Sequence, residues 1–358
     1  MITCFILFLL GSIAFGQEKE KRPLALSLKG HYGFVILHSQ DIRPIGNSYP
    51  WGIQADLSWH NNTQKAYNSC FCFPRLGVSI YYWDFDNPEI LGQGLTSIFF
   101  IEPFFGASQT ISFSFRAGFG LAYANRPYDE ISNPDNLSYS TRISFPIILA
   151  ATLNYKLNSK FMVNLSANYN HISNGGMKEP NKGINYPTAS LGLDYYLRQG
   201  NFAPYKKADW KAEKPKRNKF YIGGFGTAKQ LNEKGELQRY AVFGLQGRFS
   251  RQVSRINAIS FGVEAMNDGV HKEEIARDSL DVDHHMAGIL IGNEFLLGKF
   301  LFGQQFGIYV YNPYNQNTTT FQRYWLDYTF AKYFYMGIGL KAHGHVADFL
   351  DFRLGVFL

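Results

Sequence analysis

Apolar and polar residues alternate along most of the chain, in short segments separated by polar loops. In the segment 51–60 every odd position is apolar, whereas the even positions carry Gly, Gln, Asp, Ser and His. Successive side chains of a β-strand point to opposite faces, so this pattern predicts strands with one apolar and one polar face. The same alternation recurs at 24–36, 75–87, 95–105, 111–126, 140–156, 160–173, 184–198, 218–231, 237–252, 255–267, 284–296, 299–311, 321–332, 334–345 and 347–358. No long segment has the periodicity of a helix.

The number of strands and the lengths of the loops indicate an antiparallel transmembrane β-barrel. About sixteen strands are expected, with fourteen as an alternative, and single-chain outer-membrane barrels have an even number. Such barrels place short turns in the periplasm and long loops outside. With a periplasmic N-terminus, short turns at 106–110, 157–160 and 297–299 lie inside, and long loops at 127–140, 268–283 and 312–320 lie outside. Two long connections, 62–73 and 199–217, fall on the periplasmic side by this count.

Composition favours the barrel over other classes of protein. Aromatic residues make up 17% of the chain and charged residues only 18%. The mean hydropathy is −0.19, and after the N-terminus there is no apolar run of about twenty residues that would form a transmembrane helix. A soluble all-β sandwich would expose a strongly charged face, but the polar positions here are rich in Asn, Ser, Gln and Gly. We therefore expect an integral protein of the outer membrane.

The N-terminus has the pattern of a secretory signal peptide spanning residues 1–16. Its apolar core runs over 5–15, and Ala14-Phe15-Gly16 is a small-x-small cleavage site. Cys4 would leave with this peptide, so Cys70 and Cys72 remain. In an oxidising periplasm these two could form a small ring, or both could stay unpaired.

The formal net charge of +7 is partly local, because seven basic residues lie between positions 206 and 219. This segment could meet lipid phosphates or be a solvated connection between strands. Beyond the high isoelectric point, nothing predicts binding of nucleic acid, and no metal site or cofactor is expected.

The strand 161–173 carries two polar side chains on its apolar face, His171 and Ser173. The parity of the next strand, 184–198, places Asn185 on the same face. A serine hydroxyl becomes a useful nucleophile when a histidine takes its proton, and the histidine needs a third group to orient it. By contrast, His343 and His345 are expected to point to the polar interior of the barrel.

The residues after Ser173 complete the candidate site. The backbone amides near Asn174, Gly175 and Gly176 could approach an oxyanion, because glycine adds no side chain.

The segment 171–185, HISNGGMKEPNKGIN, resembles the active-site segment of the lipid A 3-O-deacylase (PagL-like acyloxyacyl hydrolase) family. These are outer-membrane esterases on an eight-stranded barrel, and the resemblance covers roughly 23–198. The matching residues are His171, Ser173, Asn174, Pro180, Asn181 and Gly183.

This resemblance implies Ser173 as nucleophile, His171 as general base and Asn174 beside the oxyanion hole. It also implies removal of the ester-linked hydroxyacyl chain at the 3 position of lipid A, without a cofactor. The partner would be lipopolysaccharide of the outer leaflet, and the protein could be a monomer or a homodimer.

The chain departs from the family pattern in two respects. The family's acid, a glutamate twelve residues after the serine, corresponds to Asn185, so that an amide orients the histidine or a displaced acid such as Glu179 replaces it. The region after 198 has no counterpart in an eight-stranded deacylase; after the basic connection 199–217, residues 218–358 either widen the barrel or form a second one. The alternative to an esterase is a non-enzymatic, porin-like or structural barrel.

Overall fold

The computed structural model describes residues 22–175, 177–200, 202, 217–231, 238–315, 317–344 and 346–358. The expected signal peptide and most of the basic segment 206–219 lie outside these residues, as does His345. The first part of the chain contains β1 (Leu24–Gly33), η2 (Gln40–Ile45), β2 (Trp51–His60), α2 (Gln64–Cys70), β3 (Arg75–Asp84), β4 (Gln93–Glu102), β5 (Phe104–Phe105), β6 (Ile111–Ala124), β7 (Ile143–Lys156), β8 (Phe161–Ser173) and β9 (Ile184–Arg198). The second part contains β10 (Asn218–Gln230), β11 (Arg239–Ser254), β12 (Asn257–Asp268), α3 (Gly269–Arg277), β13 (His285–Leu297), β14 (Phe300–Tyr311), β15 (Thr320–Thr329), β16 (Phe334–His343) and β17 (Val346–Phe357).

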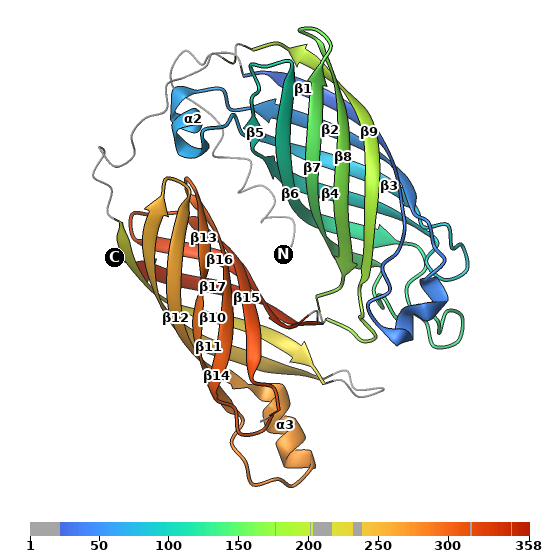
Figure 1. Ribbon diagram of the computed structural model, residues 1–358. Helices are drawn as coiled ribbons and strands as arrows, with labels where there is room; N and C mark the ends of the chain where they lie inside the picture. The colour runs from blue at the N-terminus through green and yellow to red at the C-terminus, as the bar shows by residue number, and fades with distance from the viewer. Residues whose placement is uncertain are drawn as a thin grey trace.

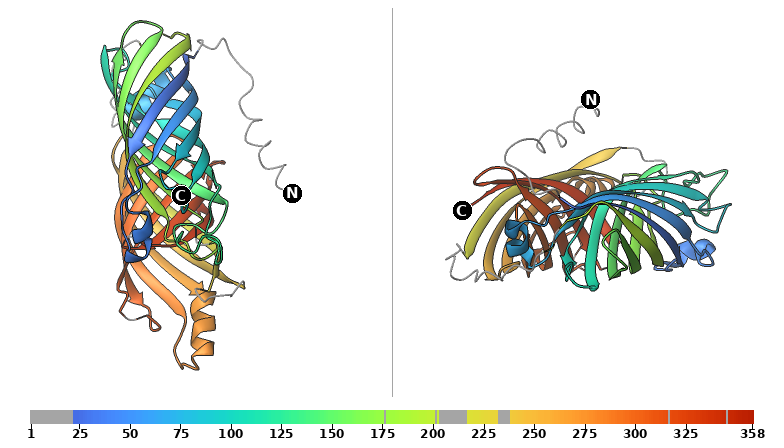
Figure 2. Two further views of the ribbon diagram at one scale, coloured as in Figure 1. Left: turned by 90° about the vertical axis from the view of Figure 1, so that its right-hand side faces the viewer. Right: turned by 90° about the horizontal axis from the view of Figure 1, so that it is seen from above.

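The long strands form two separate barrels (Figures 1 and 2). In the first, neighbouring strands pair in the order β4-β3-β2-β1-β9-β8-β7-β6, and pairing of β4 with β6 closes the sheet, with the two-residue β5 beside β6. In the second, β10 to β17 pair in sequence and β10 pairs with β17. The all-β prediction of about sixteen strands is confirmed. Residues 218–358 form a second barrel and do not widen the first.

The outer faces of both barrels are apolar, as the alternation predicts. Large apolar side chains stay exposed there in both barrels, among them Leu28, Phe99, Leu245 and Phe352. An exposed apolar band around a closed sheet is the surface that the acyl chains of a membrane cover. Neither α-helix of the described residues is long and apolar enough to cross a membrane.

Much of each interior consists of charged and polar side chains that pair with one another. In the first barrel, the Arg75 Nη2–Glu102 Oε2 distance is 2.9 Å, and the Arg116 guanidinium also bonds to Glu102 at 2.9 Å. In the second barrel, Arg323 bonds to Glu264 at 2.8 Å. An eight-stranded barrel is just wide enough for its side chains to fill it. These networks share the interiors with clusters of buried apolar side chains, such as the cluster in the first barrel that contains Tyr81, Trp83 and Tyr186.

Antiparallel pairing puts alternate connections of each barrel at opposite ends. In the first barrel the connections β1–β2, β3–β4, β6–β7 and β8–β9 share one end, which we call the long-loop end. The connection 62–73 lies at the other end, with the short turns, as the sequence predicted (Figure 1). It contains α2 and a disulfide between Cys70 and Cys72, so the paired alternative holds for these cysteines.

Candidate active site

The predicted site residues meet where β8 and β9 reach the long-loop end. β8 ends at Ser173, and the register of the two strands pairs His171 directly with Asn185. All three side chains lie on the outer face and are partly buried. Cross-strand pairing thus brings together residues that are fourteen positions apart in the sequence.

The three side chains form a hydrogen-bonded line. The Ser173 Oγ lies 3.1 Å from His171 Nε2, and His171 Nδ1 lies 2.7 Å from Asn185 Oδ1. Both distances are within the range that proton transfer and orientation of the imidazole require. The alternative acid, Glu179, accepts a hydrogen bond from the backbone N–H of Asn181 instead.

Two further residues, not predicted from the sequence, contact the Asn185 amide. The Tyr169 hydroxyl donates to Asn185 Oδ1 at 2.8 Å. The Asn185 Nδ2 lies 3.1 Å from His38 Nδ1, and His38 Nε2 lies 2.9 Å from the carbonyl oxygen of Lys182. Tyr169 shares the outer face of β8 two residues before His171, which was a usable signal. His38 is in the β1–β2 loop, and nothing local in the sequence points to it.

The shorter contacts of His38 indicate the proton positions along this line. Its Nε2 donates to the Lys182 carbonyl at 2.9 Å, and its Nδ1 accepts from Asn185 Nδ2 at 3.1 Å, a shorter distance than the 3.4 Å to the Ile36 carbonyl oxygen. The acceptor nitrogen then faces the NH₂ group of Asn185, which turns the amide oxygen toward His171. The His171 Nδ1 must therefore donate, and its Nε2 is left as an acceptor for the Ser173 hydroxyl. This is the tautomer that a general base needs.

The loop after Ser173 is held by its own polar side chains. Asn174 is fully buried; its amide donates to Ser140 Oγ at 3.1 Å and to the Lys178 carbonyl at 2.6 Å. Its backbone N–H donates to Asn181 Oδ1 at 2.9 Å. Asn174 follows Ser173 directly, and its side chain braces the loop; its place beside an oxyanion hole stays a prediction.

Gly183, another residue of the motif, lies against the imidazole. Its φ of +73° is in the left-handed region that favours glycine, and a Cβ there would lie 2.9 Å from His171 Cε1. The neighbouring loop supports it, because the Gly183 N–H donates to the Ser138 carbonyl at 2.7 Å. A side chain at this position would push the imidazole out of line with Ser173.

His343, near the C-terminus, is separate from this site. His343 lies inside the second barrel, where its Nε2 is 2.9 Å from the Tyr309 hydroxyl and its Nδ1 is 3.8 Å from Asp348. The expected interior position is thus observed for His343, within a network of barrel residues.

Comparisons with known proteins match both barrels. A family model described as lipid A 3-O-deacylase (PagL) matches residues 48–194, and one described as acyloxyacyl hydrolase, C-terminal domain, matches residues 218–357. No curated protein matches the chain.

Similar solved structures include Neisserial surface protein A and the outer membrane enzyme PagL. The first is 10% identical with a TM-score of 0.35, covering 49% of this chain and 97% of its own. The second is 17% identical with a TM-score of 0.32, covering 46% and 97%. A variant of Rh. blastica porin is 9% identical with a TM-score of 0.23, covering 94% and 100%. On the two family matches, the chain is an integral outer-membrane protein and belongs to the lipid A 3-O-deacylase (PagL) family.

Proposed function

We propose that the protein is a lipid esterase that removes the ester-linked acyl chain at the 3 position of lipid A, with Ser173 as nucleophile. The family assignment indicates lipid A deacylation in the outer membrane. The observation that supports the finer proposal is the hydrogen-bonded line from Ser173 through His171 to Asn185, at distances of 3.1 Å and 2.7 Å.

The reaction proceeds through an acyl-enzyme. Ser173 Oγ attacks the ester carbonyl carbon while its proton passes to His171 Nε2. The tetrahedral intermediate collapses, the C–O bond to the sugar breaks, and the sugar oxygen takes the proton from His171. Water then attacks the acyl-serine with His171 again accepting a proton, which releases the fatty acid and restores the serine. The imidazolium of each step donates through Nδ1 to the Asn185 oxygen.

The amide of Asn185 can orient His171 as the family's carboxylate would, but it carries no negative charge. Its oxygen receives two hydrogen bonds, from His171 and from Tyr169, and its nitrogen donates to His38. This fixes which end of the amide faces the base. The lower stabilisation of the imidazolium would slow proton transfer, because a neutral dipole interacts with a cation less strongly than a full charge does.

The oxyanion would be met by the backbone of the turn that follows the nucleophile. The N–H of Asn174 is already donated to Asn181 Oδ1, so we assign the first donor to the N–H of Gly175. Gly175 has a φ of +68°, in the left-handed region that favours glycine, and it adds no side chain that would keep an oxyanion away from its N–H. Asn174 keeps the position that the family resemblance implies and acts by bracing the turn.

The outer-face position of the site suits a substrate that lies in the membrane. Tyr169 and Leu165 precede His171 on the same face of β8 and are exposed, as the acyl chains of a lipid would require. The long-loop end is the end at which outer-membrane barrels face the outside. Lipid A of the outer leaflet would therefore reach Ser173 sideways from the bilayer.

The porin-like alternative has less support, because the barrel interiors carry paired ions instead of an open lumen. In the first barrel, fully buried Arg75 pairs with Glu102 on the neighbouring strand at 2.9 Å and reaches Asp194 on β9 at 2.6 Å, and in the second, buried Lys341 lies 2.9 Å from Glu264. A conducting pore needs a water-filled passage, which larger barrels have.

Mass spectrometry of lipid A tests the proposal directly. The full chain is expressed in a Gram-negative host whose lipid A carries an acyl chain at the 3 position. We expect wild type to remove one hydroxyacyl chain and Ser173→Ala to leave lipid A intact. Ser159→Ala, in the exposed turn between β7 and β8, serves as the matched control and should behave as wild type. Identical spectra from wild type and Ser173→Ala, with both proteins folded in the outer membrane, would reject the esterase.

A further inference from the structure

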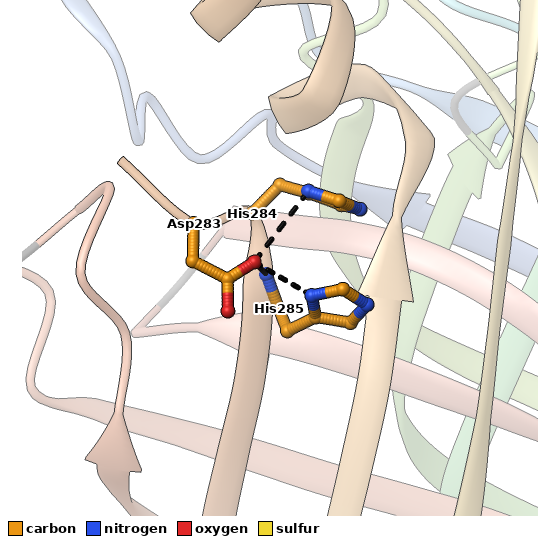
Figure 3. Close-up of side chains that lie close together, drawn as sticks. All are labelled: Asp283, His284 and His285. Atoms are coloured by element: carbon orange, nitrogen blue, oxygen red, sulfur yellow. Dashed lines mark hydrogen bonds and ion pairs between the residues drawn. The ribbon is translucent and has the colours of Figure 1, made fainter. Parts of the chain in front are cut away.

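Three potential metal ligands converge at the start of β13 in the second barrel. One ligand atom each of Asp283, His284 and His285 lies within 4.8 Å of the others (Figure 3). The Asp283 Oδ1 is 2.6 Å from His285 Nδ1 and 3.6 Å from His284 Nδ1. Consecutive residues in a regular strand would point apart, but His284 precedes β13 and its ring can turn to the same side as that of His285.

The side-chain amide of Asn267 contacts both imidazole rings on the side away from Asp283. The Nδ2 of Asn267 lies 2.9 Å from His284 Nε2 and 3.2 Å from His285 Nε2. Asn267 comes from the neighbouring strand β12, where it pairs with His285. With their Nε2 edges directed to one group, the rings present their Nδ1 edges to Asp283.

The carboxylate is held as well. The Tyr311 hydroxyl, at the end of β14, donates to Asp283 Oδ2 at 2.9 Å. This leaves Oδ1 directed to the histidines. The two strands that flank β13 thus supply the groups that orient the cluster, Asn267 from β12 and Tyr311 from β14, as outer residues do in metal sites.

We propose that Asp283, His284 and His285 bind a Zn²⁺ ion through the two Nδ1 atoms and the carboxylate Oδ1. Imidazole nitrogens with a carboxylate oxygen are a ligand set that zinc uses, with water at the fourth position. Ligand atoms of a tetrahedral zinc site lie roughly 3.3–3.5 Å apart, for bonds of about 2.0–2.1 Å. The distances of 2.6 Å and 3.6 Å from Asp283 Oδ1 lie to either side of this spacing.

Zinc binding requires a rearrangement of protons that this site can supply. In the metal-free cluster the His285 Nδ1–H donates to Asp283 while Nε2 accepts from Asn267. The bound ion takes the place of the Nδ1 protons, and each ring then carries its proton at Nε2. A half-turn of the Asn267 amide brings Oδ1 to these N–H groups, so Asn267 serves either tautomer.

The site is distinct from the candidate active site. It lies on the second barrel, at the end that also carries α3, whereas Ser173 and His171 belong to the first. Bound zinc would tie the segment before β13 to the rim of the barrel. The proposal does not rest on the esterase activity.

Calorimetric titration tests the zinc site. The full chain, folded in detergent micelles and freed of metal by a chelator, is titrated with Zn²⁺ alone. We expect wild type to bind about one Zn²⁺ and the double variant His284→Ala/His285→Ala to lose this binding. Asn267→Ala should bind zinc about 10–100-fold more weakly, the usual effect of removing a residue that orients metal ligands.

The matched control is His271→Ala, which removes a histidine on α3 that is outside the cluster. It should keep the zinc affinity of wild type. Asp283→Asn, which preserves shape, tests the cluster if the double variant does not fold. Zinc binding that is unchanged in folded His284→Ala/His285→Ala or Asp283→Asn, or absent from wild type at millimolar Zn²⁺, would overturn the proposal.

Discussion

At the residue scale, the proposed mechanism requires the Asn185 amide to orient His171 at the position where the family resemblance implies a carboxylate. A carboxylate has two equivalent oxygens, so either can accept from His171. An amide has a donor end that would hold His171 in the wrong tautomer, with Nε2 protonated and unable to accept from Ser173. His38 excludes that orientation by accepting from Asn185 Nδ2, and the Lys182 carbonyl fixes His38 in turn. The backbone of one loop thereby sets the proton on the base.

His38→Leu should therefore lower the turnover of the wild-type protein, in which residue 185 is an asparagine. The variant removes one hydrogen bond that holds the amide, and a net loss of about 1.4 kcal/mol corresponds to a tenfold change. We expect kcat for lipid A deacylation to fall about tenfold with little change in KM. His38→Gln, whose amide oxygen can accept in place of Nδ1, should recover part of this loss.

The effect of His38→Leu is compared in two proteins, wild type and the variant Asn185→Glu. A carboxylate at position 185 stabilises the imidazolium of His171, so this variant should turn over faster than wild type. Both oxygens of a carboxylate can accept from His171, so His38→Leu should lower kcat only slightly in the Asn185→Glu variant. Equal losses from His38→Leu in both backgrounds would show that His38 supports the loop rather than the amide, because coupling energy distinguishes the two roles.

At the element scale, strands that face lipid must place their charged residues inside. Glu102 on β4 shows how completely they are paired. It accepts from Arg75, from Arg116 and from the Ser114 hydroxyl at 2.6 Å. Side chains of three adjacent strands, β3, β4 and β6, are thus tied together on the interior side of the first barrel. Removing one member of such a cluster leaves buried charges without compensation.

Glu102→Gln should destabilise the first barrel by about 3–5 kcal/mol, since two buried guanidinium groups lose their shared carboxylate. Lys182→Gln is the comparison, because it removes the exposed ion pair with Asp41 at 3.1 Å and should leave the free energy of unfolding nearly unchanged. Urea unfolding of each variant in lipid vesicles, followed by tryptophan fluorescence, gives the two free energies. Similar values for both would contradict the role of the interior cluster.

The strands were predictable because alternation with a period of two is a local signal. The predicted segment 51–60 and β2 have the same bounds, and 184–198 matches β9. The pairs that close the barrels, β4 with β6 and β10 with β17, were not predictable, because the local sequence of a strand does not show which strand it pairs with. His38 was missed for the same reason. Parity placed Ser173, His171 and Asn185 on one face, and the family resemblance implied their roles.

At the scale of the whole molecule, two closed barrels differ from one wide barrel in what they can enclose. A single sheet of sixteen strands would surround a water-filled channel, as porins do. Closure after eight strands leaves room only for side chains, and the second barrel repeats this arrangement with Arg323 bonded to Glu264 and Asp351. The two barrels do touch near the active site, because Arg239 Nη2 donates to the Met177 carbonyl at 3.1 Å.

This architecture predicts that the protein does not conduct ions as a porin does. Reconstituted in planar bilayers, wild type should give no stable conductance steps, whereas a sixteen-stranded porin in the same preparation should give them. The physical reason is desolvation: an ion entering either barrel would meet buried, paired charges such as Arg75 with Glu102 instead of water. Regular, porin-sized steps that persist after purification would contradict it and restore the channel alternative. Ser173 lies on the outer face of β8, so the proposed esterase would take its substrate from within the membrane and would need no lumen.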